Sequence, residues 1–332
     1  MSIIGTAVLP AWALAQSSPT VDDGPEYTGM CDASAAAALS GLGFIVANDE
    51  DNVLRVFSRT QGGPAAVTLD LTPFLRPDAK NPETDIEGAT WLGNKVVWIT
   101  SHGRNKDGKL RLSRHRLFAT EFVKVEGRTT IRGTGVPYSF LLDDLIPDPL
   151  LDKYSLHKAM RYAPKDDQGL NIEGLTSTPE GHLWIAFRNP VPEKKALIVP
   201  LVNPLEVLEG GIPAKRCRFD TPIELDLNGL GIRSIEYHAP WQTYIILAGP
   251  KSSGEVKLYL WSGARDSSPV RIEQVDFGSM TPEAFVCYRD GDETVLQLFS
   301  DDGTRPVDGM ECKALTNPAD RHFRSVFIRG LK

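Results

Sequence analysis

A glutamate recurs along the chain at the same place in a short motif. The clearest copies are Asp85-Ile86-Glu87-Gly88 and Asn171-Ile172-Glu173-Gly174. Weaker copies place Glu236 and Glu283 in the same frame, and the first copy has Ser34 where the others have glutamate. If the copies meet in space, their carboxylates repel one another. They then need protonation, a metal ion or cationic side chains to balance their charge.

Oxygen donors without histidine or cysteine favour a hard divalent cation. At a flexible site we expect Ca²⁺, with Mg²⁺ as the alternative. Two other interpretations stay open. The glutamates could cap backbone N–H groups of neighbouring repeats and bind nothing, or Arg104 and Arg188 could balance their charge and hold an anionic ligand. The candidate metal ligands are the four motif glutamates, Glu87, Glu173, Glu236 and Glu283.

An apolar segment follows each motif after a short turn. Its distance from the motif residue is 10, 9, 10, 8 and 12 residues in the five copies. This regular spacing, together with enrichment in β-branched and aromatic residues, predicts a second β-strand in every unit. The expected strands are Phe44–Ala47, Val96–Ile99, Leu183–Ala186, Tyr244–Leu247 and Val295–Leu298.

Third and fourth strands are predicted in most units, and radial repetition of four antiparallel strands is the β-propeller pattern. We therefore expect an all-β fold, a propeller of five blades with six as the alternative, in one domain over residues 31–332. The last unit lacks a fourth strand, so residues 16–30 are expected to be a linker or a closing strand. A helical insert at 139–162, on the channel-mouth face, is expected to serve as a lid.

Polar residues end the second strands, and in a propeller these ends open on the face where the inner strands begin. His102 lies there and is the expected proton shuttle, with a merely solvated loop histidine as the alternative. Together with His102, we assign Arg104 and Arg188 to the catalytic group, because arginines can orient an anionic substrate. The expected substrate-binding residues are Asn48, Asp49, Ser101, Asn189 and Asp301.

Residues 1–15 are apolar and end in Ala13-Leu14-Ala15, a pattern typical of a signal peptide, although no Lys or Arg precedes Ala15. We expect export to the periplasm or out of the cell. The alternative for this segment is a closing strand or a disordered tail. The four cysteines show no C-x-x-C spacing. In an exported protein Cys31 and Cys312 are the pair to test, and four isolated thiols are the alternative.

The formal net charge is -7, and no run of Lys or Arg occurs. Nucleic acid and an anionic membrane surface are therefore unlikely partners on electrostatic grounds. No stretch reaches the roughly 18 to 20 apolar residues that span a bilayer. We expect a small anionic substrate or ligand and a monomeric protein.

Several segments resemble a bacterial family catalogued as domain of unknown function 3616, and the resemblance runs from about Cys31 to Ile328. The most specific segments are Phe44–Val56 and Ser101–Lys109, with the two clear motif copies. More loosely, the Asp/Asn-Ile-Glu-Gly repeats look like those of esterase-like phytase and regucalcin-type propellers. That resemblance implies a channel-mouth Ca²⁺ and hydrolysis of phosphoesters or lactones. It reaches only the four glutamates, and Ser34 departs from it.

The expected function is that of an exported, divalent-metal-dependent hydrolase acting on an anionic phosphoester or lactone at the channel mouth. The alternative is a non-catalytic propeller that binds a ligand or a protein on the same face. Propellers host both kinds of function, so the fold alone does not decide between them.

Overall fold

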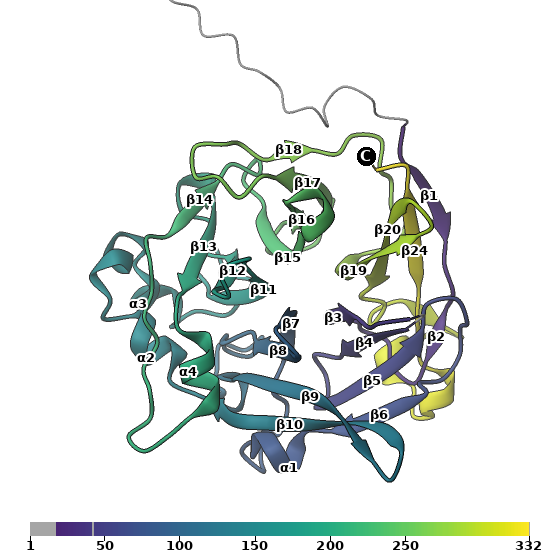
Figure 1. The fold of residues 1–332 in the computed structure, drawn as a ribbon, viewed down its shortest axis with the longest axis horizontal. Helices are drawn as coiled ribbons and strands as arrows, with labels where there is room; N and C mark the ends of the chain where they lie inside the picture. Colours follow the sequence, from purple (N-terminus) through teal and green to yellow (C-terminus); the bar gives the residue numbers. More distant parts are fainter. Residues whose placement is uncertain (1–17, 42, 332) are drawn as a thin grey trace, which may run out of the picture.

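Five four-stranded antiparallel sheets surround a common axis, as Figure 1 shows. The structure is a computed structural model that describes residues 18–41 and 43–331. The predicted five-bladed β-propeller is confirmed. The predicted signal peptide at residues 1–15 lies outside the described residues. Among those described, no helix has the length and apolar character to cross a lipid bilayer.

The second strand of each blade is almost wholly buried, because neighbouring blades cover both of its faces. This explains why these strands appear in the sequence as continuous apolar runs rather than alternating ones. Trp98 on the second strand of one blade and Trp261 on the third strand of another are fully buried. Apolar clusters fill the spaces between blades, so each blade is stabilised mainly by its neighbours.

The first three blades follow one another along the chain, each running from the axis to the rim. The first contains β3 (Ala35–Ala38), β4 (Gly43–Ala47), β5 (Val53–Ser58) and β6 (Val67–Asp70). The second contains β7 (Ile86–Leu92), β8 (Lys95–Thr100), β9 (Leu117–Val125) and β10 (Arg128–Tyr138). The third contains β11 (Asn171–Ser177), β12 (Leu183–Asn189), β13 (Ala196–Leu201) and β14 (Ile223–Leu225).

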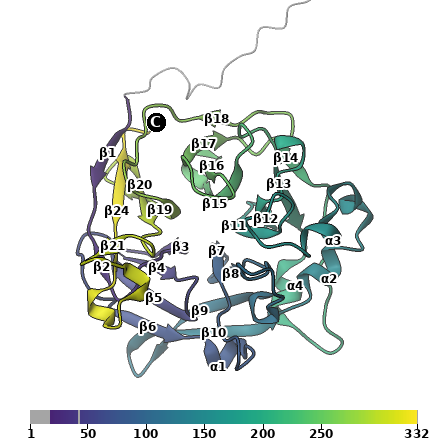
Figure 2. The same cartoon turned by 180° about the vertical axis from the view of Figure 1, so that it is seen from behind.

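The N-terminal part of the described chain closes the ring. Val21 pairs with Ile328, so the strand that contains Val21 is the outermost strand of the fifth blade (Figure 2). Within the segment 16–30, for which a linker or a closing strand was expected, residues 20–23 form this strand. The fourth blade contains β15 (Gly231–His238), β16 (Thr243–Gly249), β17 (Lys257–Trp261) and β18 (Val270–Arg271). The fifth contains β19 (Pro282–Asp290), β20 (Glu293–Ser300), β24 (Ser325–Arg329) and β1 (Thr20–Asp23).

A disulfide joins Cys31 to Cys312, as proposed from the sequence, and Cys217 and Cys287 are free thiols. The bond links positions 281 residues apart. A cross-link over so long a loop removes much entropy from the unfolded chain, roughly 5 kcal/mol in the chain-entropy estimate. Small elements lie around this closure: β2 (Tyr27–Thr28), β21 (Pro306–Val307), β22 (Met310–Glu311), η6 (Cys312–Ala314), η7 (Pro318–Asp320) and β23 (His322–Phe323).

The predicted insert is helical, but its apolar residues pack into the protein core. Leu141, Leu145 and Leu156 lie in one cluster with side chains of the second and third blades. In the segment that follows, the carbonyls of Pro164 and Asp166 accept hydrogen bonds from Asn189 at the end of the second strand of the third blade. The helices of the insert are therefore a wedge between blades rather than a lid. They are α2 (Leu141–Leu145), η3 (Pro149–Tyr154) and α3 (Leu156–Ala159). The other short helices are α1 (Thr72–Leu75), η2 (Leu112–Arg114), η4 (Pro192–Lys194), α4 (Pro204–Glu209) and η5 (Ala239–Trp241).

Candidate functional site

The inner strands of four blades begin with a shift in their pairing register. In each, one residue is left between two paired positions, and these residues are Glu87, Glu173, Arg233 and Glu283. A bulged residue bends its strand and redirects its side chain. In the first blade Ser34 takes the corresponding place just before β3, where its backbone N–H donates to Ala47 at 3.2 Å. The repeat therefore places one side chain per blade at the same level of the axis.

Glu236 does not lie with this group, in contrast to the prediction. It sits three residues further along β15, where it pairs with Ile245, and its carboxyl contacts Cys287. The sequence Ser-Ile-Glu copies the letters of the motif but not its register, because the bulge falls at Arg233. The positively charged side chain of Arg233 thus takes the place in the fourth blade that glutamate takes in the second, third and fifth blades. Burial raises the pKa of Glu236 to about 8.

Arginines balance two of the ring carboxylates. Arg188 Nη1 lies 2.5 Å from Glu173 and 3.9 Å from Glu283, and Arg233 forms an ion pair with Glu283. Glu173 also accepts a hydrogen bond from Asn171 at 2.8 Å. Glu173, Arg188 and Arg233 are all buried. Arg104 and Arg188 were the arginines proposed from the sequence to balance the glutamates, and Arg188 does contact two of them. Arg233 was not predicted for this role.

A second set of carboxyls lies above the ring, where the first and fifth blades meet. Asp32 pairs with Asp301 in an isolated β-bridge. Burial, with a hydrogen bond to Asp301, raises the pKa of Asp32 to about 11. Burial would also raise the pKa of Asp301, but the hydrogen bond with Asp32 and the Gly303 N–H hold it below its ordinary value. The pair therefore shares one proton, which resides on Asp32 at neutral pH.

Asp49 and Glu87 complete this carboxyl cluster. Burial, followed by repulsion from Asp85 and Glu283, raises the pKa of Asp49 well above its usual range. Burial and repulsion from Glu173 do the same for Glu87. Neither side chain hydrogen-bonds to a described residue, and Asp49 Oδ1 is buried. We call Asp32, Asp49, Glu87, Glu283 and Asp301 the acidic centre.

His102 is not part of the acidic centre. It is buried, its Nδ1 lies 2.8 Å from the Thr100 carbonyl, and its ring stacks on His115 at 5.5 Å. Burial and the neighbouring His115 lower the pKa of His102 to about 3, so it is neutral at physiological pH. Its backbone is left-handed, with φ of 53°, and turns the ring toward His115. The proton-shuttle assignment is therefore not supported.

Arg104 also has a structural environment. Its Nε donates to the Met160 carbonyl at 2.8 Å and its Nη1 to the Gly108 carbonyl at 3.0 Å. These bonds hold the loop Ser101–Lys109 against the end of the helical insert. Ser101 is fixed by a hydrogen bond to Asp85. Neither Arg104 nor Ser101 contacts the acidic centre.

The two predicted amide ligands hold the backbone in place. Asn189 Nδ2 donates to the carbonyls of Pro164 at 3.0 Å and Asp166 at 2.7 Å. The positive charge of Lys165, in the same segment, helps to lower the pKa of Asp301. Asn48 Oδ1 accepts from the Glu50 N–H at 3.0 Å. Of the predicted substrate-binding residues, the structure brings only Asp49 and Asp301 together at the axis.

No group of three or more His, Cys, Asp or Glu side chains in residues 18–41 and 43–331 stands close enough to enclose a metal ion. The predicted glutamate ring does not fit a metal in this arrangement, since Glu173 and Glu283 already contact arginines. Asp32 and Asp301 had no motif to reveal them together. Asp32 stands in the first motif copy, three residues before β3, and Asp301, one of the predicted substrate-binding residues, directly follows β20 on the other side of the ring closure.

The family described as "Protein of unknown function (DUF3616)" matches residues 138–303, half of the chain. The chain belongs to the DUF3616 family. Among curated proteins, none matches it significantly. The matched region of the DUF3616 family runs from the start of the insert to Gly303, two residues beyond Asp301, so it includes the third and fourth blades.

Several solved structures match most of the chain, but at low sequence identity and low TM-score. The PQQ-bound aldose sugar dehydrogenase of Streptomyces coelicolor is 12% identical over 95% of this chain and 100% of that chain, with a TM-score of 0.42. The allergen Mala s 1 of Malassezia sympodialis is 11% identical over 84% and 77%, with a TM-score of 0.43. The virginiamycin B lyase of Staphylococcus aureus is 8% identical over 93% and 99%, with a TM-score of 0.36. Likeness at this level says nothing about chemistry.

Glu236 should make stability depend on pH. The folded protein keeps this proton up to about pH 8, whereas the ordinary value for glutamate is 4.5. Stability should therefore fall as pH rises from about 5 to 8. Glu236→Gln cannot ionise, so its melting temperature should fall less than that of the wild type over this range. The exposed Glu180→Gln serves as control and should follow the wild type. Parallel curves for wild type and Glu236→Gln would contradict the assignment.

Proposed function

We propose that this protein is a hydrolase whose reactive groups are those of the acidic centre, with a divalent cation as cofactor. The observation that carries the proposal is the local excess of carboxyls. Asp49 and Glu87 have no hydrogen-bond partner among the described residues, and Asp32 shares a proton with Asp301. Buried polar groups without partners are costly, and such groups in native proteins often contact an ion or a substrate.

Asp49 and Glu87 are the residues that would hold the cation, in place of the glutamate ring expected from the sequence. Their oxygen donors suit Ca²⁺, with Mg²⁺ as the alternative. Both carboxyls must lose a proton to serve as ligands, so binding and proton release are coupled. When bound, a divalent cation polarises a phosphoryl or carbonyl oxygen of the substrate.

The Asp32–Asp301 pair supplies acid and base. Asp301 accepts the proton of the attacking water as the new oxygen bond forms to phosphorus or to the carbonyl carbon. Asp32 gives its proton to the leaving oxygen as the old bond breaks. The proton then returns from Asp301 to Asp32 through their hydrogen bond, which restores the pair. Two carboxyls with separated pKa values are a common acid–base arrangement.

Arg188 is the group proposed to orient an anionic phosphoester or lactone substrate. Its Nη1 is held by Glu173 and its Nε donates to the Pro250 carbonyl at 3.1 Å. Its Nη2 makes no hydrogen bond with a described residue, so two donors are left for a substrate oxygen. A single small substrate at the axis requires only one copy of the chain, in keeping with the predicted monomer.

Ca²⁺ binding should release protons and stabilise the protein. At pH 7 we expect about one to two protons per ion, measured by calorimetry in buffers of different ionisation enthalpy. At a hundredfold excess over Kd the gain in stability should be about 2.7 kcal/mol. Asp49→Asn should abolish both effects, whereas Glu236→Gln, lower in the channel, should retain them. Equal melting curves with Ca²⁺ and with chelator would refute the cation.

Turnover should depend on Asp301. With a panel of phosphoesters and lactones, Asp301→Asn should lower kcat by about 10² to 10⁴, the usual contribution of a general base. Ca²⁺ binding, measured on the same sample, should persist, because Asp301 is not assigned as a ligand. Glu236→Gln should keep wild-type turnover. If the wild type binds Ca²⁺ but hydrolyses nothing in the panel, the protein is a binding propeller, as in the alternative raised from the sequence.

We also propose that the protein is exported to the periplasm or out of the cell. The Cys31–Cys312 disulfide supports this, because disulfides persist in oxidising compartments. Mature protein from its host should begin near Gln16, by N-terminal sequencing. Thiol labelling without reductant should modify neither Cys31 nor Cys312. A chain that retains Met1 and carries four reactive thiols would show that it stays inside the cell.

A further inference from the structure

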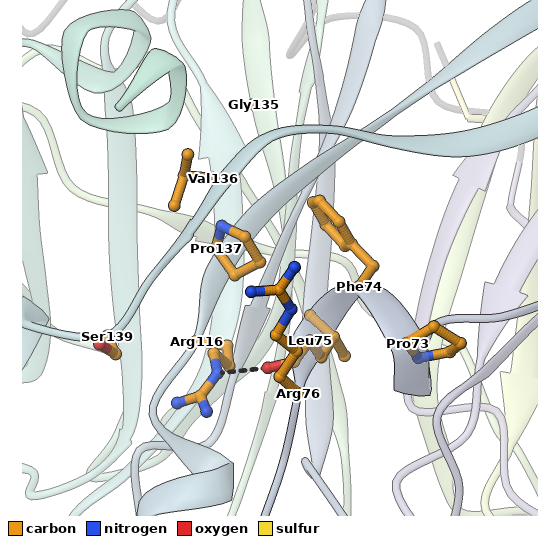
Figure 3. A pocket seen from close by; sticks show the side chains of 9 residues that line it. All are labelled: Pro73, Phe74, Leu75, Arg76, Arg116, Gly135, Val136, Pro137 and Ser139. Atoms are coloured by element: carbon orange, nitrogen blue, oxygen red, sulfur yellow. Dashed lines mark hydrogen bonds between the residues drawn. The ribbon is translucent and has the colours of Figure 1, made fainter. Parts of the chain in front are cut away.

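A pocket of about 420 Å³ lies at the rim of the propeller, away from the acidic centre. It is formed where α1 approaches β10, and Figure 3 shows its side chains. Its size is within the range of small-ligand sites. The lining residues are Pro73, Phe74, Leu75, Arg76, Arg116, Gly135, Val136, Pro137 and Ser139.

One wall of the pocket forms where the pairing between β10 and its partner strand β9 is interrupted. Thr134 pairs with Ala119 and Tyr138 pairs with Leu117, so the three residues at 135–137 have no partner on β9. Gly135 has φ of 69° and approaches the Leu208 carbonyl so closely that no larger residue fits. Pro137 lacks a backbone N–H, so it leaves no backbone donor without a partner. The segment thus presents an apolar surface opposite Phe74.

Arg116 is fixed in this pocket by the backbone. Its Nε donates to the Leu75 carbonyl at 3.3 Å, and its Nη1 donates to the carbonyls of Leu112 at 2.9 Å and His115 at 2.8 Å. Its Nη2 has no hydrogen-bond partner among the described residues. It forms no ion pair with a described residue either. Burial lowers the pKa of Arg116 from its ordinary value, although the group stays charged.

Arg76 brings a second positive charge to the same space. It is exposed, it follows α1 with a left-handed φ of 49°, and its guanidinium lies between Phe74 and Pro137 in Figure 3. Its side chain makes no hydrogen bond or ion pair with a described residue. Most other arginines that line the blades contact carboxylates, as Arg132 does with Glu121 at 2.7 Å. The pocket therefore holds two guanidinium groups without a carboxylate.

We propose that this pocket binds a small organic anion, a carboxylate carried on an apolar body. Guanidinium groups with free N–H donors match a carboxylate. The ring of Phe74 and the side chains of Val136 and Pro137 match an apolar body, which inorganic anions lack. The inference uses none of the residues of the acidic centre, so it does not depend on the proposed hydrolase activity.

Calorimetry with three probes tests the proposal. Benzoate carries both the charge and the apolar body, benzyl alcohol carries the body alone, and inorganic phosphate carries charge alone. Benzoate should bind at least about tenfold more tightly than benzyl alcohol, since a hydrogen bond to a charged group contributes about that much. It should also bind at least about tenfold more tightly than phosphate, which buries no apolar surface against Phe74. Arg76→Met should weaken benzoate binding by about tenfold or more. The control variant Arg132→Met changes an arginine on β10, the strand that forms one wall of the pocket, and should leave benzoate binding unchanged.

Arg116→Met should abolish benzoate binding, but its three bonds to the backbone also hold the loop in place. Arg76 is exposed and without partners, so Arg76→Met should keep the wild-type melting temperature and provides the decisive measurement. The proposal is overturned if benzoate does not bind the wild type. It is equally overturned if phosphate binds as well as benzoate, or if Arg76→Met binds benzoate as the wild type does.

Discussion

The radial fold forces ionisable side chains from different blades into one small volume, and the structure depends on how their charges are balanced. Every inner strand starts near the axis, and in four blades the start is a bulge that carries Glu or Arg. Burying one carboxylate without compensation costs several kcal/mol, so a ring of like charges would destabilise the fold. Arg188 and Arg233 remove this cost for Glu173 and Glu283. The pairing in the ring therefore serves the fold first, and the proposed chemistry rests instead on Asp49, Glu87 and the Asp32–Asp301 pair.

Closure of the propeller places the remaining carboxyls. Asp32 follows Cys31, which is tied to Cys312, and the Asp302 N–H donates to the Cys31 carbonyl at 3.0 Å. Arg324 in turn holds Asp302 at 2.6 Å. These contacts bring the two ends of the chain together and set Asp32 against Asp301. The disulfide and the closing strand β1 thus position the proton-sharing pair as well as stabilise the fold.

The propeller could be predicted because its signals are local and repeated. The buried second strands appear in the sequence as apolar runs, and their regular spacing from the motif predicts each blade in turn. The level of each residue along the axis could not be predicted in the same way. Ser234-Ile235-Glu236 has the letters of the motif, yet a bulge at Arg233 moves Glu236 away from the ring. The environment of His102 could not be predicted from its place in the sequence either, because the structure buries its ring against His115. Asp32 and Asp301 are distant in sequence, and only the closed ring shows that they meet.

In this protein the local distribution of charged side chains is more informative than the net charge. The net charge of -7 suggests only that polyanions are poor partners. Within the structure, however, Asp49 and Glu87 of the acidic centre form no ion pair with a described residue, and the rim pocket holds two guanidinium groups without a carboxylate. No described residue corrects either imbalance. Under the two proposals a cation would balance the carboxylates of Asp49 and Glu87, and an organic anion would balance the guanidinium groups of the rim pocket, each adding stability because it binds only the folded chain.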